Sequence, residues 1–261
     1  MDAEALRDEA LSLADTADRI AARHFGGPVP AVAKPDGSPV TAADREIETA
    51  LRTAIGARHP DHAVLGEEEG GVLEDDAPTW VIDPIDATKN FLRGIPVFAT
   101  LIAVVDAGRV VAAVVSAPAM GERWDAAAGA GARRNGERVA VSAIADLAEA
   151  QLLHGGLEWF RGDPDSWERL GALTDAAWRT RGFGDFWMHL LVAGGMAEAA
   201  FERDLKLWDL AAVVGVVEEA GGRATTWDGG DPLRGDGSVL SSNGVVHEQV
   251  RAHLPPSSAT G

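Results

Sequence analysis

The sequence predicts a layered protein of the α/β or α+β class. Its 261 residues correspond to one or two domains at roughly 150 residues per domain, and 46% hydrophobic residues can fill a sizeable core. Segments with helical periodicity alternate with short apolar segments typical of strands, and we find no internal repeat or obvious linker.

Two amphipathic helices are expected first. Apolar residues recur at helical spacing over residues 1–25, and Gly26, Gly27 and Pro28 end that helix. The second helix, about 41–58, begins at a capping-box pattern from Thr41 to Asp44. A short buried strand follows at 81–82, and segments 98–105 and 109–115 form a hairpin that turns at 106–108.

The second half continues the alternation. We expect helices over 166–178, 185–196 and 210–220, the last ending at Gly221 and Gly222. Strands over 223–227 and 238–242 and a helix over 245–253 close the chain, and 255–261 is expected to be a flexible tail. The region from about 145 onward could form a second, packed half.

Composition excludes several classes of protein. Lys and Arg total 23 against 41 Asp and Glu, so the net charge is −18, which repels nucleic acid and anionic lipid. There is no cysteine, hence no disulfide, thiolate nucleophile or cysteine-bound metal. The first 25 residues are acidic where a signal peptide would be basic, and the apolar region 101–120 is interrupted by charge. We expect a cytoplasmic protein with no nucleic-acid or membrane partner.

The densest chemical feature is a set of carboxylates. The segment Gly66-Glu67-Glu68-Glu69-Gly70 precedes a hydrophobic strand that we expect to stop at Asp83, because Pro84 cannot donate a backbone hydrogen bond. Asp86 can then point back toward Asp83. Two carboxylates 4 Å apart repel by roughly 4 kcal/mol at an effective dielectric of 20, so such a cluster needs cations or protons between its members. Carboxylate oxygens are hard ligands, which suit Mg²⁺. Alternatively, Asp86 and Thr88 cap a helix and residues 67–69 are a solvated turn.

Three motifs, taken in their order along the chain, favour the metal site over the helix-cap and solvated-turn alternatives. They are Gly66-Glu67-Glu68, Asp83-Pro84-Ile85-Asp86-Ala87-Thr88 and Trp208-Asp209. Together they resemble the inositol monophosphatase family of Mg²⁺-dependent, lithium-sensitive phosphatases, over nearly the whole chain. The resemblance implies the layered αβαβα sandwich of the inositol monophosphatase and fructose-1,6-bisphosphatase fold. It also implies a homodimer and one catalytic domain over 1–254, with halves of about 1–144 and 145–254.

The resemblance implies the site residues as well. Two or three Mg²⁺ ions per site would be held by Glu67, Asp83, the Ile85 carbonyl, Asp86 and Asp209. The family's water-activating threonine and its aspartate partner match Thr88 and Asp44, and Lys34 matches the upstream lysine. Glu67, Thr88 and Asp44 would then be the catalytic residues that orient and deprotonate the attacking water. Asp44 could instead serve only as a helix cap.

Ala87 departs from the family, which usually has glycine between the second aspartate and the threonine. A positive φ there would cost alanine about 1 kcal/mol. We expect instead that Ala87 lies in the first turn of a helix, where alanine is favourable and the backbone N–H groups at 87–89 face the phosphate.

Three segments, 86–97, 116–119 and 178–185, resemble histidinol-phosphate phosphatases of this family, and Lys89 stands where inositol phosphatases more often have a second threonine. Asp185 and Glu202 could pair with the ammonium and imidazole of histidinol. The expected substrate contacts are Asp86, Ala87, Thr88, Arg181, Asp185, Glu202 and Asp209. Asp185 could equally be an N-cap, and Arg181 a structural ion pair.

The expected reaction is hydrolysis of L-histidinol phosphate to L-histidinol and phosphate, in histidine biosynthesis. One alternative is an inositol-1-phosphate phosphatase or a broad phosphomonoesterase. A second alternative, from another class, is a catalytically silent assembly protein that binds divalent ions.

Overall fold

The computed structural model describes residues 2–256 apart from 28–30, 34–38 and 162–163. The family match at Lys34 and most of the expected tail, 257–261, therefore lie outside the described residues. The helices are α1 (Ala3–His24), α2 (Ala42–Arg58), α3 (Thr88–Leu92), α4 (Glu158–Arg161), α5 (Pro164–Ala176), α6 (Asp185–Ala193), α7 (Leu207–Glu219) and α8 (His247–Arg251), with 3-10 turns η1 (Pro118–Met120), η2 (Leu147–Glu149) and η3 (Pro232–Arg234).

The first of two large sheets has seven strands in chain order. Its members are β3 (Ala63–Gly66), β4 (Thr79–Asp86), β5 (Ala99–Asp106), β6 (Arg109–Ala117), β7 (Glu122–Ala127), β8 (Gly131–Arg134) and β9 (Glu137–Arg138). β3 and β4 are parallel, and the other neighbours are antiparallel. The expected hairpin is β5–β6, with Ala107 and Gly108 at φ of 47° and 74° in its turn.

The second sheet has five strands in the order β11-β10-β12-β14-β13. Its members are β10 (Gln151–His154), β11 (Arg179–Gly182), β12 (Ala199–Glu202), β13 (Arg223–Thr225) and β14 (Val239–Ser242). β10 is parallel to both of its neighbours, and β14 is antiparallel to β12 and β13. A separate pair, β1 (Ala31–Ala33) and β2 (Pro39–Thr41), precedes α2.

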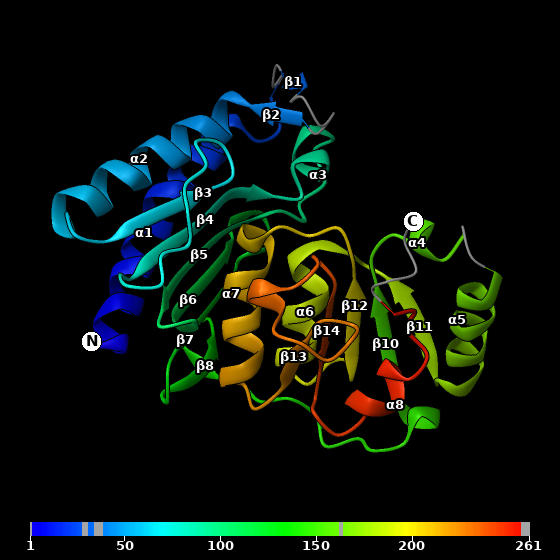
Figure 1. Ribbon diagram of the computed structural model, residues 1–261. Helices are drawn as coiled ribbons and strands as arrows, with labels where there is room; N and C mark the ends of the chain where they lie inside the picture. The colour runs from blue at the N-terminus through cyan, green and yellow to red at the C-terminus, as the bar shows by residue number, and fades with distance from the viewer. Residues whose placement is uncertain (1, 28–30, 34–38, 162–163, 257–261) are drawn as a thin grey trace.

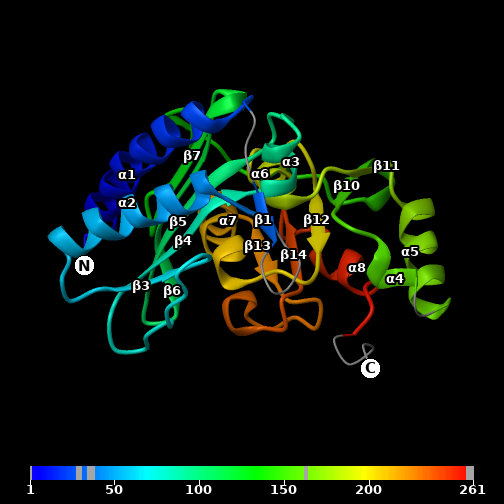
Figure 2. The ribbon, with the colours of Figure 1, turned by 90° about the horizontal axis from the view of Figure 1, so that it is seen from above.

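The layers run αβαβα, as Figures 1 and 2 show. On β4 the side chains of Trp80 and Ile82 pack with α1 and α2, while Val81 packs with α6 and α7 on the opposite face. α6 and α7 also contact the second sheet, so both helices are apolar on nearly every side. Helices α5 and α8 cover the outer face of that sheet. The predicted fold class is therefore confirmed.

The strand that carries the aspartates is longer than expected. Pro84 does not end it, because β4 resumes pairing with β5 at Asp86 after a register shift between Asp83 and Asp86. The Thr100 hydroxyl donates to the Pro84 carbonyl at 2.8 Å, which satisfies the backbone inside the irregularity. Both aspartates thus lie on one distorted strand end.

None of the helices in the described part of the chain is both long and apolar enough to cross a membrane. The two large sheets occupy residues 63–138 and 151–242. The expectation of one catalytic domain over 1–254, with halves meeting near residue 145, stays a prediction.

Candidate metal centre

The core of the site is three aspartates from two elements. Asp83 and Asp86 lie on the irregular end of β4, and Asp209 lies in the first turn of α7. Each places a carboxylate oxygen within 4.8 Å of the others. Asp83 accepts the backbone N–H of Ile85 at 3.0 Å, and Asp209 accepts that of Lys206 at 2.6 Å. Backbone N–H groups close in the chain therefore hold the Asp83 and Asp209 carboxylates.

Burial and mutual repulsion define the electrostatics of this cluster. Desolvation raises the pKa of Asp83 well above its usual value, and the charges of Glu67, Asp86 and Asp209 raise it further. Desolvation also raises the pKa of Asp86 well above its usual value and that of Asp209 to about 7. A cation among these groups would relieve the repulsion.

Glu67 belongs to the cluster through Asp83. A side-chain hydrogen bond joins the two, in addition to their charge interaction. The possible metal ligands in the cluster of Asp83, Asp86 and Asp209 are all carboxylate oxygens. Such hard oxygen donors fit Mg²⁺ rather than a soft metal. The structure therefore brings together the four carboxylates expected as metal ligands.

The expected pairing of Thr88 with Asp44 is not the arrangement observed. The Thr88 hydroxyl donates to the Ile85 carbonyl at 2.9 Å. Asp44 closes the capping box of α2, with Oδ2 accepting the Thr41 N–H at 2.8 Å and the Thr41 hydroxyl at 2.5 Å. Asp44 nevertheless lies near Glu67, whose charge adds to the desolvation that raises the Asp44 pKa. Its buried Oδ1 has no hydrogen-bond partner among the described residues.

The expectation for Ala87 is wrong. Ala87 has φ 65° and ψ 44°, the left-handed conformation, and stands at the N-cap position of α3 rather than in its first turn. The chain changes direction sharply at Ala87, after the irregularity in β4, and does so through the left-handed conformation. Glycine adopts that conformation without strain. Neither Asp86 nor Thr88 caps α3, since no side chain caps that helix.

A second acidic pair lies beside the three aspartates. Desolvation, followed by the charge of Asp185, raises the pKa of Glu202 to about 8. Desolvation also raises the pKa of Asp185, and Lys89 opposes that shift. Gly155 allows Glu202 to approach, because a Cβ at this position would lie 2.0 Å from Glu202 Oε1. Glu202 Oε2 is buried and has no hydrogen-bond partner among the described residues.

Asp185 is not an N-cap. Gly184 occupies the cap position, and Asp185 is the first residue of α6, with φ values of 65° and 53° respectively. This unusual backbone directs the N–H of Phe186 to Asp86 Oδ2 at 2.8 Å. The start of α6 therefore supports a carboxylate of the aspartate cluster, through a long-range contact that no local sequence pattern predicts.

Arg181 lies outside this arrangement. It is exposed on the edge strand β11, and its guanidinium donates to the Thr180 carbonyl at 2.7 Å. The ion-pair alternative also finds no support, because no ion pair of Arg181 occurs among the described residues.

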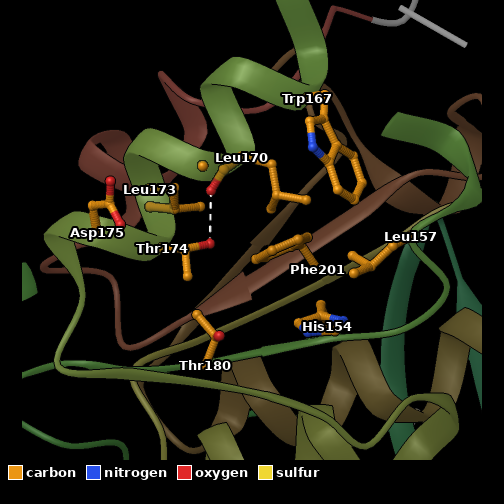
Figure 3. A pocket seen from close by; sticks show the side chains of 10 residues that line it. His154, Leu157, Trp167, Leu170, Leu173, Thr174, Asp175, Thr180 and Phe201 are labelled. Carbon is orange, nitrogen blue, oxygen red and sulfur yellow. Dashed lines mark hydrogen bonds between the residues drawn. The ribbon is translucent and has the colours of Figure 1, made fainter. Parts of the chain in front are cut away.

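A separate cavity of about 300 Å³ lies between α5 and the outer face of the second sheet (Figure 3). Trp167, Leu170 and Phe201 line it, with His154 and Thr180 below. Phe201 and Glu202 are neighbours on β12, so their side chains point to opposite faces of the sheet. The cavity is therefore on the other side of the sheet from the acidic pair.

One buried carboxylate near the site was missed. Glu48 on α2 is fully buried and accepts backbone N–H groups of the Glu67 segment. The spacing of Asp44, Ile47, Glu48, Leu51 and Ile55 is the signal that could have revealed it, because these positions share the buried face of the helix.

Comparison with known proteins agrees with the fold and the motifs. The sequence profile of the inositol monophosphatase family matches residues 2–258. A histidinol-phosphatase of Mycobacterium tuberculosis is 44% identical, over 94% of this chain and 96% of its own length. A histidinol-phosphatase of Streptomyces coelicolor is 38% identical, over 93% and 94%. An IMPase structure from Thermotoga maritima superposes with a TM-score of 0.85 at 30% identity, over 94% of this chain and 95% of that one. The chain belongs to the inositol monophosphatase family.

Proposed function

We propose that this protein is a Mg²⁺-dependent histidinol-phosphate phosphatase, which hydrolyses L-histidinol phosphate to L-histidinol and phosphate in histidine biosynthesis. Its family consists of metal-dependent phosphatases, and the relatives named above are histidinol-phosphatases at 44% and 38% identity. The observation that carries the choice of substrate is the buried pair of Asp185 and Glu202 next to the aspartate cluster.

The proposed metal ligands are Glu67, Asp83, the Ile85 carbonyl, Asp86 and Asp209, around two or three Mg²⁺ ions. Bound there, Mg²⁺ neutralises phosphate charge and lowers the pKa of water. Glu67 would accept a proton from the attacking water. Thr88 would orient that water. Asp44 is the proposed partner of Thr88, because Asp44 Oδ1 has no hydrogen-bond partner among the described residues. The proposed phosphate contacts are the backbone N–H groups of Ala87 and Thr88.

The alcohol part of the substrate would face Asp185 and Glu202. Burial disfavours the ionised form of both carboxyl groups, so a cationic ligand gains by pairing with them. Histidinol carries an ammonium group and an imidazole, whereas inositol is neutral. The unpartnered Oε2 of Glu202 is the acceptor that we assign to the histidinol cation.

Asp185→Asn tests this assignment. Losing a charge-assisted contact worth about 1.5–3 kcal/mol should lower kcat/KM for L-histidinol phosphate by at least tenfold. The rate with inositol 1-phosphate should change much less. Asp175→Asn, an exposed aspartate at the separate cavity, makes the same charge change and should alter neither rate. Equal wild-type kcat/KM values for the two substrates would overturn the narrow assignment.

We further propose a cytoplasmic homodimer whose partner is a small phosphomonoester rather than nucleic acid or membrane. The net charge of −18 supports the absence of a polyanionic partner. The dimer is proposed by analogy with the family.

A further inference from the structure

The segment Gly66–Gly70, which carries Glu67, closes around a carboxylate from another element. Glu48 on α2 has 0% of its surface exposed. Its Oε2 accepts the N–H of Glu68 at 2.7 Å, and its Oε1 accepts the N–H of Glu69 at 3.0 Å. Successive backbone N–H groups that converge on one carboxylate form an anion-binding concavity. An acidic segment is thus organised by a further acidic residue.

The other backbone N–H groups of this segment are also committed. Gly66 and Gly70 exchange hydrogen bonds at 3.0 and 3.1 Å, and Glu67 donates to the Ile82 carbonyl at 3.3 Å. With the two bonds to Glu48, each N–H from residue 66 to residue 70 has an acceptor. These bonds hold the backbone from which the Glu67 side chain reaches its hydrogen bond with Asp83.

Arg52 makes the buried charge tolerable. Its Nε donates to Glu48 Oε1 at 2.9 Å, while its other nitrogens donate to the Gly70 and Val64 carbonyls at 2.5 and 3.3 Å. A buried carboxylate without a cation would be strongly destabilising. The same guanidinium therefore neutralises Glu48 and binds the segment that Glu48 organises.

Gly66 leaves the space that Glu48 occupies. A Cβ at this position would lie 2.2 Å from Glu48 Oε1 and 2.5 Å from its carboxyl carbon. A methyl group and the Glu48 carboxylate cannot both be accommodated without movement. The glycine of this motif is thus required by Glu48, and not by its own backbone conformation, since its φ is not positive.

We infer that Glu48 is a positioning residue, which holds Glu67 in the orientation that binds the metal and so sets the affinity of the site for Mg²⁺. This inference rests on the proposed function, which places Glu67 among the Mg²⁺ ligands. Glu48 itself bonds to the backbone behind Glu67. It therefore acts through segment 66–70, as do other groups that do not touch a metal but orient the residues that bind it.

The test is the Mg²⁺ dependence of thermal unfolding, which needs no substrate. Mg²⁺ that binds the folded state raises the free energy of unfolding by RT ln(1 + [Mg²⁺]/Kd), so the shift of Tm with Mg²⁺ concentration gives Kd. Glu48→Gln replaces one acceptor oxygen with an NH₂ group, and should raise Kd by about tenfold or more. Glu46→Gln makes the same charge change on the exposed side of α2, where Glu46 pairs with Arg23, and should leave Kd unchanged.

A purely structural role would give a different result. Glu48→Gln would then lower Tm without Mg²⁺ but leave Kd at the wild-type value, and this outcome would overturn the inference. Gly66→Ala supplies a second route, since its methyl group displaces Glu48. We expect it to raise Kd in the wild-type background and to add little in a Glu48→Ala background. Fully additive effects of the two substitutions would contradict the proposed contact.

Hydrogen exchange on the metal-free wild type keeps the inference falsifiable if the variants do not fold. The amides of Glu68 and Glu69 should be protected to an extent similar to the amides of β4, and rapid exchange at both would overturn the inference. Failure of the proposed function is recognised separately. A wild type that shows no Mg²⁺-dependent shift refutes the metal site itself, whereas an unchanged Kd in Glu48→Gln refutes only the role of Glu48.

Discussion

Single residues at the aspartate cluster are constrained by geometry that a motif does not express. Asp83, Asp86 and Asp209 could be chosen from the sequence because their motifs carry them, and the structure places them together. Ala87 could not be interpreted correctly, because its left-handed conformation follows from the register shift in β4, a property of pairing with β5. The buried position of Glu48 on α2 could be read from the helical spacing, but the backbone N–H groups that donate to it could not, because they belong to a distant segment.

Ala87→Gly should therefore stabilise the protein. The left-handed conformation costs alanine roughly 1–2 kcal/mol, and the greater freedom of glycine in the unfolded chain offsets about 0.4–1 kcal/mol of that gain. We expect the free energy of unfolding to rise by about 0.5–1 kcal/mol in urea denaturation. Ala54→Gly, inside α2, is the matched control and should lower it by a similar amount. A loss of stability in Ala87→Gly would contradict the strain assigned to this residue.

Elements with long amphipathic periodicity were predictable, and short polar strands were not. The structure confirms the helices expected over 1–25, 41–58 and 166–178, each with its ends shifted by a few residues. Strands β7, β8 and β9 were missed, because segment 122–138 is rich in arginine and glycine and is recognisable only through the pairing of β7 with β6, β8 with β7 and β9 with β8. Tertiary pairing overrides local propensity at such strands.

His247 gives an element-scale prediction, because it joins α8 to two strands. It is 0% exposed and bonds to Thr225 on β13 at 3.0 Å and to Ser242 on β14 at 2.7 Å. Burial lowers its pKa to about 4, so the folded state keeps it neutral while the unfolded chain protonates it below about pH 6.5. Its contribution to stability is thus complete above that pH and is lost as the pH falls toward 4.

The matching measurement compares wild type with His247→Gln in urea at pH 7 and pH 5. The wild type should be the more stable at pH 7, and the difference between the two should shrink at pH 5. Using the difference removes the titration of all other groups that the two proteins share. A difference that is the same at both pH values would show that the histidine does not titrate as inferred.

At the scale of the whole molecule, the fold brings carboxylates from distant parts of the chain to one place. Asp83 and Asp86 come from the first sheet, whereas Asp209 and Glu202 come from α7 and the second sheet. Nothing in local sequence places these segments together, so this part of the site was accessible only through the family resemblance. The layered architecture implied by that resemblance is confirmed, because helices α6 and α7 fill the space between the sheets.

The cluster should make the metal-free protein less stable as the pH rises. The pKa values of Asp209 and Glu202 are raised to about 7 and about 8, so the folded state holds more protons than the unfolded chain above about pH 4. Stability therefore falls toward pH 8, where Mg²⁺ should restore it by about 2.7 kcal/mol at 100 times Kd. NaCl at equal ionic strength should do much less. Equal effects of the two salts on Tm would indicate screening without a site.

The most direct test is phosphate release from L-histidinol phosphate during a Mg²⁺ titration, with wild type and Asp83→Asn side by side. We predict that wild-type activity requires Mg²⁺, saturates with it and disappears on chelation. Asp83→Asn should remain folded by circular dichroism yet lose more than about 100-fold in kcat/KM, a larger effect than that of groups that only support metal ligands. Hydrolysis that persists in chelator, or at the wild-type rate in Asp83→Asn, would contradict the assignment of this aspartate cluster as the catalytic metal site.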